Sequence, residues 1–576
     1  MKGSKHKLQK FHRQGRLPLV CATRSRAIFG VLLPVLLIMI IFPAVAAGSD
    51  SCPGCGMVWT DTCVPFENNN ETAYNEELAA AFAPIAANMT PVANFSNESW
   101  SDAFLSLHTL IKERYAFTRW RSVDWDTLYQ TYAPAIADAE KKQDKAAYYR
   151  TLREYLYAVP DGHVVILATE SEFGAKKADI GGGFGLTLVQ LDSGDVVVGY
   201  VANGSAADKE GIRFGDEVTA WNGLAIHEAI NATSPIWAYK KPSTEEGIQI
   251  QKTRLLTRAP VGTPAMITVV RGTLLRTVNL TAYDDGYDTV KKGTFFLGKE
   301  INDLGAGNPL TDITPQISND TVTVRTLPGG YTSIAVYGES YAVYQPFRAA
   351  MLSLIANKTP GVVIDLRFNS GGDDNLASCM AGWFVNKPVF YEYATMYDPG
   401  SRKFPVATEA WTQPQPVRYT GPVAVLVSPD TISSGEGIPK IFAQSGTGAI
   451  VSWYGTNGAF GMNNIQAILP LGKYIFFPTG ASLDQNGTIQ VDSSASLAGG
   501  IAPTIRVPLN EDTLKRAMTG EDVQLTYAME WLDSQQKQNA SVAASVPATP
   551  TQKASLVPAL PLVALGILVA IAGRRK

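Results

Sequence analysis

Two short apolar runs in the second half of the chain each lead through a turn of small residues into a helix. The first run, at 362–366, enters a turn that contains the paired glycines Gly371 and Gly372. The second, at 423–428, enters a helix that begins near Ser433 and Ser434. Short apolar strands that alternate with helices indicate an α/β core with buried strands, and the alternation extends over about 322–508.

Both turns carry residues that suit chemistry on an anion. Glycines let backbone N–H groups approach an anionic oxygen closely, and the helix that follows adds partial positive charge. A serine at the start of the second helix would be exposed where a developing anion is stabilised. A serine at such a place is more often simply a helix cap, so this turn alone identifies no nucleophile.

Residues 180–281 change to short β-rich runs separated by Gly and Asp, which predicts a small β module. The stretches GGGFGLTL and VVVGYVANGSAADKEGIRFGDEVTAWNG resemble a PDZ domain of the kind inserted in tail-specific proteases. The resemblance places Gly183, Phe184, Gly185 and Leu186 in a carboxylate-binding loop. Such a loop aims backbone N–H groups at a peptide C-terminus, while the adjoining strand edge pairs with the peptide. The alternative is a plain β hairpin with glycines for turn geometry.

The two turns, VVIDLRFNSGGDDN and PDTISSGEGIPKIF, together resemble the tail-specific and tricorn-core proteases. The family motifs are D-L-R-x-N-x-G-G and a nucleophilic serine three residues before a Glu. The resemblance implies Ser433 as nucleophile, with Glu436 matching the Glu. It also implies an oxyanion hole from the backbone of Gly371 or Gly372 and of Ser434, and a ClpP/crotonase-like core fold.

A serine hydroxyl needs a general base to react at neutral pH. Bacterial tail-specific proteases use a lysine, and Met462 stands at that position here. A Ser/Lys dyad is therefore absent unless another lysine, such as Lys473, reaches the site. The tricorn-like branch uses a histidine after its helical region, which implies His163 as the base.

Two positions depart from the tricorn-like pattern. The Ser and the Glu that orient the histidine in that branch are replaced here by Gly162 and Leu497. Asp161 or Asp492 are candidates to take over the orienting role, on the basis of their nearness in sequence alone.

The ends of the chain predict export and membrane attachment. A basic start precedes an uncharged apolar run at 27–47, and a second such run at 556–573 ends in Arg574, Arg575 and Lys576. We therefore expect a cell-surface protein tethered to the membrane with its body outside, and Asn-x-Ser/Thr sequons suit a glycoprotein. Cys52, Cys55 and Cys63 form a cluster that favours a disulfide over a metal site, while Cys379 stands alone and the sequence leaves the pairing of these four cysteines open.

The predicted fold is an α/β ClpP/crotonase-like peptidase core with a helical N-terminal cap, a β-rich PDZ-like domain, and apolar membrane segments at both ends. The predicted domains are these: 1–47 signal peptide or signal anchor; 48–75 Cys-containing segment; 76–175 helical N-terminal cap; 176–285 PDZ-like domain; 286–320 connector; 321–534 tail-specific protease core; 535–555 Ser/Thr/Pro/Ala linker; 556–576 C-terminal membrane segment or sorting signal.

The predicted function is an exported serine endopeptidase that hydrolyses polypeptides captured by the PDZ-like domain. The alternative is a catalytically silent surface protein that binds peptides or hydrophobic ligands on the same fold. No metal or organic cofactor is implied. The net charge of -3 provides no basic footprint for nucleic acid.

Overall fold

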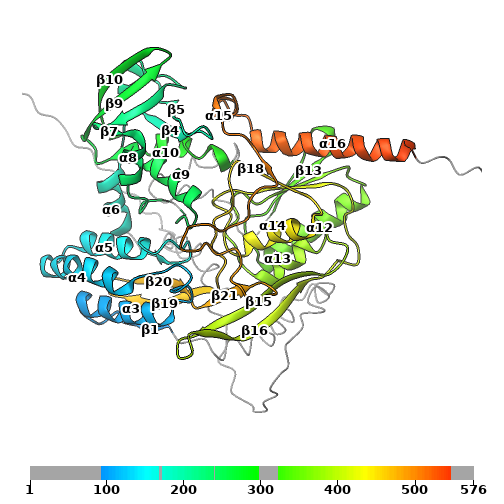
Figure 1. Ribbon diagram of the computed structural model, residues 1–576, viewed down its shortest axis with the longest axis horizontal. Helices are drawn as coiled ribbons and strands as arrows, with labels where there is room; N and C mark the ends of the chain where they lie inside the picture. Colours follow the sequence, from blue (N-terminus) through cyan, green and yellow to red (C-terminus); the bar gives the residue numbers. More distant parts are fainter. Residues whose placement is uncertain (1–91, 168–170, 239, 298–321, 546–576) are drawn as a thin grey trace, which may run out of the picture.

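A six-stranded sheet lies at the centre of the computed structural model, which describes residues 92–167, 171–238, 240–297 and 322–545 (Figure 1). Its strand order is β12-β13-β14-β17-β18-β22, with β12 antiparallel to β13 and every other pair parallel. The strands are β12 (Thr323–Thr326), β13 (Thr332–Ala335), β14 (Val362–Asp365), β17 (Val423–Leu426), β18 (Ala449–Ser452) and β22 (Ile505–Arg506).

Both faces of this sheet are buried, because the side chains of a strand point alternately to its two faces. Ile364 and Val425 contribute to one apolar cluster, and Val363 and Ala424 to another. Helices α12 (Tyr341–Ala356), α13 (Asp374–Ala381) and α14 (Ser434–Ser445) cover the first face, and α16 (Val523–Ser545) covers the second (Figure 1). The remaining elements here are η3 (Pro328–Gly330) and α15 (Glu511–Met518).

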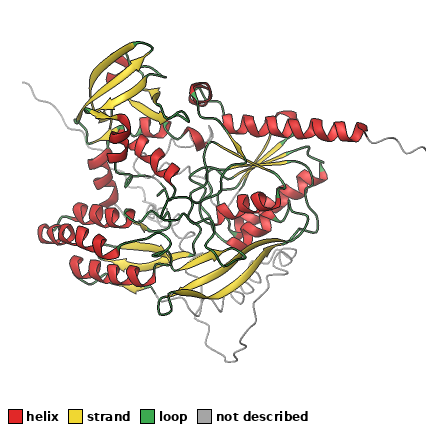
Figure 2. Ribbon diagram, viewed as in Figure 1, coloured by secondary structure: helices red, strands yellow, loops and turns green. Residues whose placement is uncertain are grey.

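Two smaller sheets extend the core (Figure 2). A long hairpin of β15 (Val389–Asp398) and β16 (Lys403–Thr412) pairs with β21 (Gly480–Leu483). The strands β19 (Asn463–Leu469) and β20 (Lys473–Pro478) pair with β1 (Ala93–Asn94) and β2 (Val165–Leu167) from the N-terminal region. The N-terminal region is therefore fastened to the core by strand pairing.

Helices form most of the N-terminal region. They are α3 (Trp100–Arg114), α4 (Trp125–Lys142), α5 (Lys145–Tyr157) and α6 (Ser171–Ile180). The first three begin at Ser99, Asp124 and Asp144, whose side chains accept hydrogen bonds from backbone N–H groups of the first turn. Tyrosine, tryptophan and phenylalanine side chains fill much of the space between these helices.

A β-rich unit follows α6. Its main sheet has the order β10-β9-β6-β5-β4, with β7 paired to β6, so β4 is an edge strand. The elements are β3 (Gly182–Gly183), β4 (Leu186–Gln190), β5 (Val196–Val201), α7 (Ala206–Lys209), β6 (Glu217–Trp221), β7 (Leu224–Ala225), α8 (Ile226–Ala232), α9 (Glu245–Leu256), β8 (Arg258–Ala259), β9 (Pro264–Arg271), β10 (Leu274–Thr281), β11 (Tyr283–Asp284), α10 (Asp288–Lys292) and η2 (Phe295–Leu297). Val189 and Phe295 of this unit share an apolar cluster with Trp453 of the core, so the two pack directly together.

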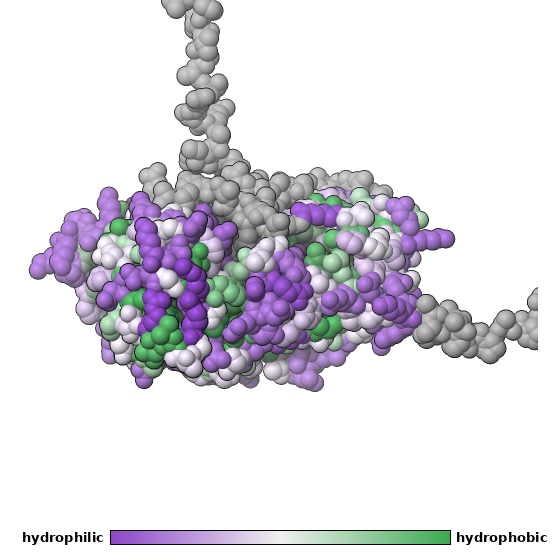
Figure 3. All heavy atoms as spheres, turned by 90° about the horizontal axis from the view of Figure 1, so that it is seen from above, coloured by the Kyte–Doolittle hydropathy of each residue, from purple (hydrophilic) through white to green (hydrophobic). Residues whose placement is uncertain are grey.

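The surface is largely hydrophilic in the view of Figure 3, with apolar residues in small patches. Across the part of the chain that the structure describes, every helix is too short or too polar to cross a membrane. This finding contradicts the predicted fold in its membrane segments and the predicted membrane-tethered localisation, and both are corrected accordingly. The terminal segments 1–47 and 556–576, on which those predictions rested, lie outside the described residues.

The structure describes one cysteine of the chain's body, one whose pairing the sequence left open. Cys379 in α13 is buried and disulfide-bonded. Cys52, Cys55 and Cys63, with the whole predicted 48–75 segment, lie outside the described residues, so the prediction for that cluster is not tested.

Candidate active site

Ser433 occupies a strained turn between β17 and α14. Its φ of 60° and ψ of -140° lie where a residue with a Cβ is rarely found. It stands at the N-cap position of α14, yet its side chain makes no capping hydrogen bond. Its backbone N–H donates to the carbonyl of Ala459 at 2.9 Å, which holds the turn in place. The hydroxyl is half-buried and has no hydrogen-bond partner among the described residues, so the helix-cap interpretation does not account for this serine.

The glycine turn after β14 packs directly against Ser433. Gly371 has a φ of 81°, and a Cβ added there would overlap the Cβ of Ser433 and lie 3.0 Å from its Oγ. A Cβ on Gly372 would overlap the backbone of Glu339. Both positions therefore require glycine because other groups approach too closely for a side chain.

The three predicted oxyanion donors are not equivalent. The N–H of Gly371 already donates to Asn369 Oδ1 at 2.8 Å. The N–H groups of Gly372 and Ser434, in contrast, have no acceptor among the described residues. The Ser434 hydroxyl donates to the carbonyl of Gly372 at 2.9 Å, which joins the two turns. Two unused donors thus remain beside Ser433, one of them at the N-terminus of α14, where the helix dipole favours an anion.

Asn369 and Glu436 hold these turns from within the core. The side-chain amide of Asn369 donates to the carbonyl of Val336 at 3.1 Å and to Glu339 Oε1 at 2.6 Å, while its Oδ1 accepts from the backbone N–H of Gly371. Glu436 accepts from the backbone N–H groups of Gly458 and Ala459, at 2.8 and 3.0 Å. Burial raises the pKa of Glu436 to about 8. The loop that it anchors carries the carbonyl that accepts from Ser433.

His163 follows α5 in a segment that contacts the Ser433 turn. A Cβ added to Gly162 would lie 2.9 Å from Ile432 Cδ1, so the residue before His163 contacts the residue before Ser433. The imidazole is buried, its Nδ1 has no hydrogen-bond partner, and burial lowers its pKa to about 4. No hydrogen bond joins His163 to Ser433. The structure therefore brings the two segments together without forming the dyad.

The candidate orienting acids hold an arginine instead of the imidazole. Asp161 accepts from Tyr115 Oη at 2.6 Å and from the backbone N–H of His163, and it lies 3.5 Å from Arg121. Asp492 lies 3.5 Å from the same arginine and accepts from the backbone of Phe460 at 3.0 Å. Neither carboxylate makes a hydrogen bond to the imidazole.

Three further predicted positions can be placed. The backbone of Leu497 accepts from Glu245 at the start of α9. The Met462 backbone is hydrogen-bonded to that of Gly480. The ammonium of Lys473 lies over the ring of Tyr149, 5.3 Å from its centroid, in the N-terminal aromatic cluster. None of these three makes a hydrogen bond to Ser433.

Sequence reasoning missed one charged residue at this site, Lys240. It lies in the linker between α8 and α9, and its Nζ donates to the carbonyl of Asp430 at 2.5 Å. It also donates to the carbonyl of Asn369 at 3.3 Å and to Ser370 Oγ at 3.2 Å. Two adjacent lysines in a polar stretch ordinarily indicate a solvated loop, so the local sequence contained no signal for these contacts.

The predicted carboxylate-binding loop is buried. Gly183 pairs on both sides, with Arg258 and Tyr283, and Phe184 packs edge-on against Trp221 with ring centroids 5.3 Å apart. Gly185 and Leu186 are also buried, beneath Ser205 and within the sheet.

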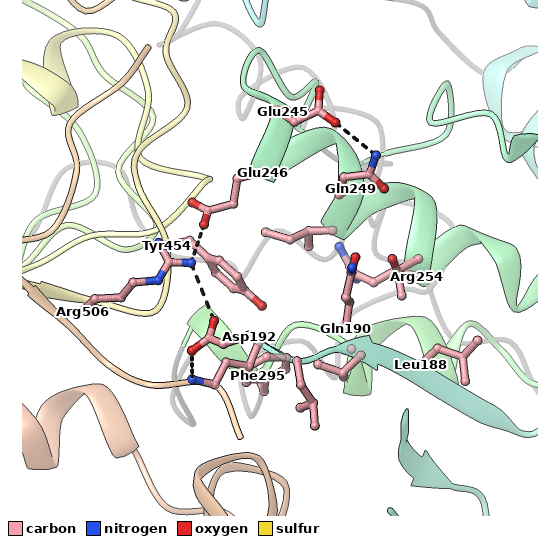
Figure 4. Close-up of a pocket in the computed structure, with 16 residues that line it drawn as sticks. Leu188, Gln190, Asp192, Glu245, Glu246, Gln249, Arg254, Phe295, Tyr454 and Arg506 are labelled. Atoms are coloured by element: carbon pink, nitrogen blue, oxygen red, sulfur yellow. Dashed lines mark hydrogen bonds and ion pairs between the residues drawn. The ribbon is translucent and has the colours of Figure 1, made fainter. Parts of the chain in front are cut away.

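The open space beside β4 lies at its other end. A cavity of about 390 Å³ lies between β4 and α9, and Phe295 and the core residue Tyr454 also line it (Figure 4). Glu246 and Asp192 both turn toward Arg506, at 2.6 and 4.0 Å (Figure 4).

Arg254 on α9 also lines this cavity. It is buried and has no carboxylate within ion-pairing distance among the described residues, and its Nε has no hydrogen-bond partner. Burial lowers its pKa to about 10. A buried guanidinium without a counter-ion is costly, so the cavity is suited to receive an anionic group.

The α/β core carries a strained serine beside two N–H groups that have no acceptor among the described residues, an arrangement that a serine-type peptidase, a hydrolase, requires. Residues 330–507 match the model of peptidase family S41, and this match supports the tail-specific, or S41, serine peptidase family. The predictions of this family and of a serine peptidase are confirmed. No curated protein matches the chain in sequence.

Solved structures of the same fold include mature CPAF, at 13% identity and a TM-score of 0.51, covering 78% of this chain and 98% of that one. The photosystem II D1 C-terminal processing protease has 18% identity and a TM-score of 0.34, covering 71% and 93%. The tricorn protease has 14% identity and a TM-score of 0.36, covering 76% and 37%. At these identities the CPAF likeness shows the fold alone.

Proposed function

We propose that the chain is a serine endopeptidase in which Ser433 attacks the peptide carbonyl and His163 is the general base. The observation that carries this proposal is a strained, unpartnered serine hydroxyl beside two free backbone N–H groups. Because the N–H groups of Gly372 and Ser434 are already in place, the tetrahedral oxyanion would need no reorganisation of the protein. One such donor contributes about 10²- to 10³-fold in kcat in other serine peptidases.

His163 would accept the proton of the Ser433 hydroxyl and later give it to the leaving amine. Its low pKa keeps the imidazole neutral at pH 7, which is the state that a base requires. The hydrogen bond between the two side chains would form when substrate binds, since such bonds often tighten only in the complex.

The substrate is a polypeptide, and we propose that the PDZ-like unit, residues 176–285, captures it. The edge of β4, which pairs with no further strand among the described residues, and the adjoining cavity support this part of the proposal, because an extended peptide can add to an unpaired strand edge. Arg254 would bind a carboxylate of that peptide. Export of the protein fits the disulfide bond of Cys379, since such bonds persist in oxidising compartments.

The proposal is tested by incubating the purified chain with an unfolded polypeptide, such as reduced and alkylated lactalbumin, and identifying the fragments by mass spectrometry. Cleavage should disappear in Ser433→Ala. It should persist in Ser353→Ala, a control on the exposed face of α12. Binding of the polypeptide without cleavage would favour a catalytically silent binding protein.

A further inference from the structure

The linker between α8 and α9 inserts two adjacent lysines between the segments of the proposed active site. Lys240 contacts the turn that ends at Ser433 and the glycine turn that packs against it, and Lys241 contacts the segment of His163. Lys241 Nζ donates to the carbonyls of Leu156 at 2.6 Å and Val164 at 2.9 Å. Val164 directly follows His163, so one linker is bonded to both halves of the proposed dyad.

The contacts of Lys240 use all three donors of its ammonium group. The carbonyl of Asp430 belongs to the turn that ends at Ser433, whereas Asn369 and Ser370 belong to the glycine turn. The backbone N–H of Ile432 donates to the same carbonyl of Asn369 at 3.2 Å. The ammonium therefore cross-links the two turns two to four residues before the free N–H groups of Gly372 and Ser434.

A third residue of the linker completes the connection. Ser243 Oγ accepts from the backbone N–H of Gly162 at 2.7 Å and donates to Asn457 Oδ1 at 2.8 Å. Asn457 in turn donates to the carbonyls of Lys241 and Pro429, at 3.2 and 3.0 Å. The linker, the His163 segment and the Ser433 turn are thus held by one continuous set of hydrogen bonds.

We propose that Lys240 is a positioning residue of the peptidase, which sets the distance between the glycine turn and Ser433 and so holds the oxyanion donors in register. This inference rests on the proposed function, because it assigns Lys240 a role in that same site. It also links the active site to the proposed peptide-binding unit. The linker that carries Lys240 leads directly into Thr244, the N-cap of α9, and α9 lines the cavity beside β4.

The charges around Lys240 favour its ammonium form. Asp430 from the Ser433 turn, Glu339 from the segment before α12 and Glu436 from α14 all act to raise its pKa, but burial outweighs them and lowers it to about 8. Nζ also lies over the ring of Phe368, 5.0 Å from its centroid, and this contact favours a cation. As the pH rises through about 8, Lys240 loses a proton and with it one of its three donors. The cross-link then weakens.

The test compares Lys240→Met and Lys240→Arg with the wild-type chain in steady-state hydrolysis of a fluorogenic peptide derived from a cleaved site. Misplacing the reacting groups by about 1 Å costs about 10²-fold, so Lys240→Met should lower kcat by ~30- to 100-fold while KM changes little. Lys240→Arg should keep most of the activity, because a guanidinium retains its charge and donors.

The pH profile separates positioning from general stabilisation. Wild-type kcat should fall above about pH 8, and in Lys240→Arg this alkaline limb should move beyond pH 10. Lys252→Met is the matched control, a half-buried lysine of α9 bonded to the carbonyl of Asn231, and it should behave as wild type. If circular dichroism shows that Lys240→Met is misfolded, the Lys240→Arg profile decides.

Wild-type kcat in Lys240→Met, or an alkaline limb that stays in place in Lys240→Arg, would overturn the inference. A wild-type chain that cleaves no polypeptide would instead refute the proposed function, and the two failures are therefore distinguishable.

Discussion

Replacing Gly371 by alanine probes the contact between the two turns most sharply. The φ of 81° places this residue in the left-handed region, and the added Cβ would overlap the Cβ of Ser433. The same Cβ would lie 3.0 Å from the carbonyl of Ile432. Because both neighbours belong to the Ser433 turn, the strain can be relieved only by moving the glycine turn away from the nucleophile.

Two separate costs follow. The left-handed backbone costs alanine ~1–2 kcal/mol in folding stability. Separating two overlapping Cβ atoms to van der Waals contact requires a shift of about 1 Å, which lowers catalytic rates by about 10²-fold. We therefore expect Gly371→Ala to lose ~100-fold or more in kcat, together with a modest loss of thermal stability.

The matched control is Gly204→Ala. Gly204 has a similar φ of 73°, but a Cβ there would meet no atom within 4 Å. It should show the stability loss without the loss in kcat when both variants are assayed by peptide hydrolysis and thermal melting. Activity of Gly371→Ala within about three-fold of wild type, or an equal loss in Gly204→Ala, would refute the reasoning.

Two further predictions concern the base and the cavity. Since burial lowers the pKa of His163 to about 4, kcat/KM should fall only as the pH drops through about 4 and the imidazole becomes protonated; an acid limb near pH 6.5 would show that another group is the base. The peptide-binding prediction uses the inactive Ser433→Ala protein and a fluorescein-labelled peptide with a free C-terminal carboxylate. Adding Arg254→Met to this protein should weaken peptide binding by ~10-fold or more in anisotropy titrations, because a buried charged hydrogen bond is worth ~1.5–3 kcal/mol. Equal peptide affinity with Arg254 and with Arg254→Met would show that this residue does not bind the peptide. A second peptide, amidated at its C-terminus and carrying one internal Glu, shows whether the bound carboxylate is a chain end or an acidic side chain.

The sequence predicted the central sheet well, because its strands are short, apolar and buried on both faces. The strand expected at 362–366 corresponds to β14, and the run at 423–428 contains β17. The long hairpin of β15 and β16 was not anticipated, since its pairing is interrupted by register shifts near Phe390 and Met396 that obscure a period of two. Helix α16 continues to Ser545, into the region where the sequence predicted a linker from 535 onward.

The site was predicted in its residues more than in its geometry. The motifs placed Ser433 beside Gly371 and Gly372, because both turns follow neighbouring parallel strands and so meet at one edge of the sheet. They could not show that the Gly371 N–H is taken by Asn369, which depends on a side chain packed under the turn. The contacts of Lys240 were equally hidden, because the linker and its acceptors are about 130 and 190 residues apart in sequence.

The central claim, that Ser433 is an activated nucleophile with His163 as its base, is tested most directly by labelling the purified full chain with a fluorophosphonate probe. The wild type and Ser353→Ala should be labelled, and Ser433→Ala and His163→Ala should not. A folded wild type that takes up no probe, or labelling that survives in Ser433→Ala, would contradict the account.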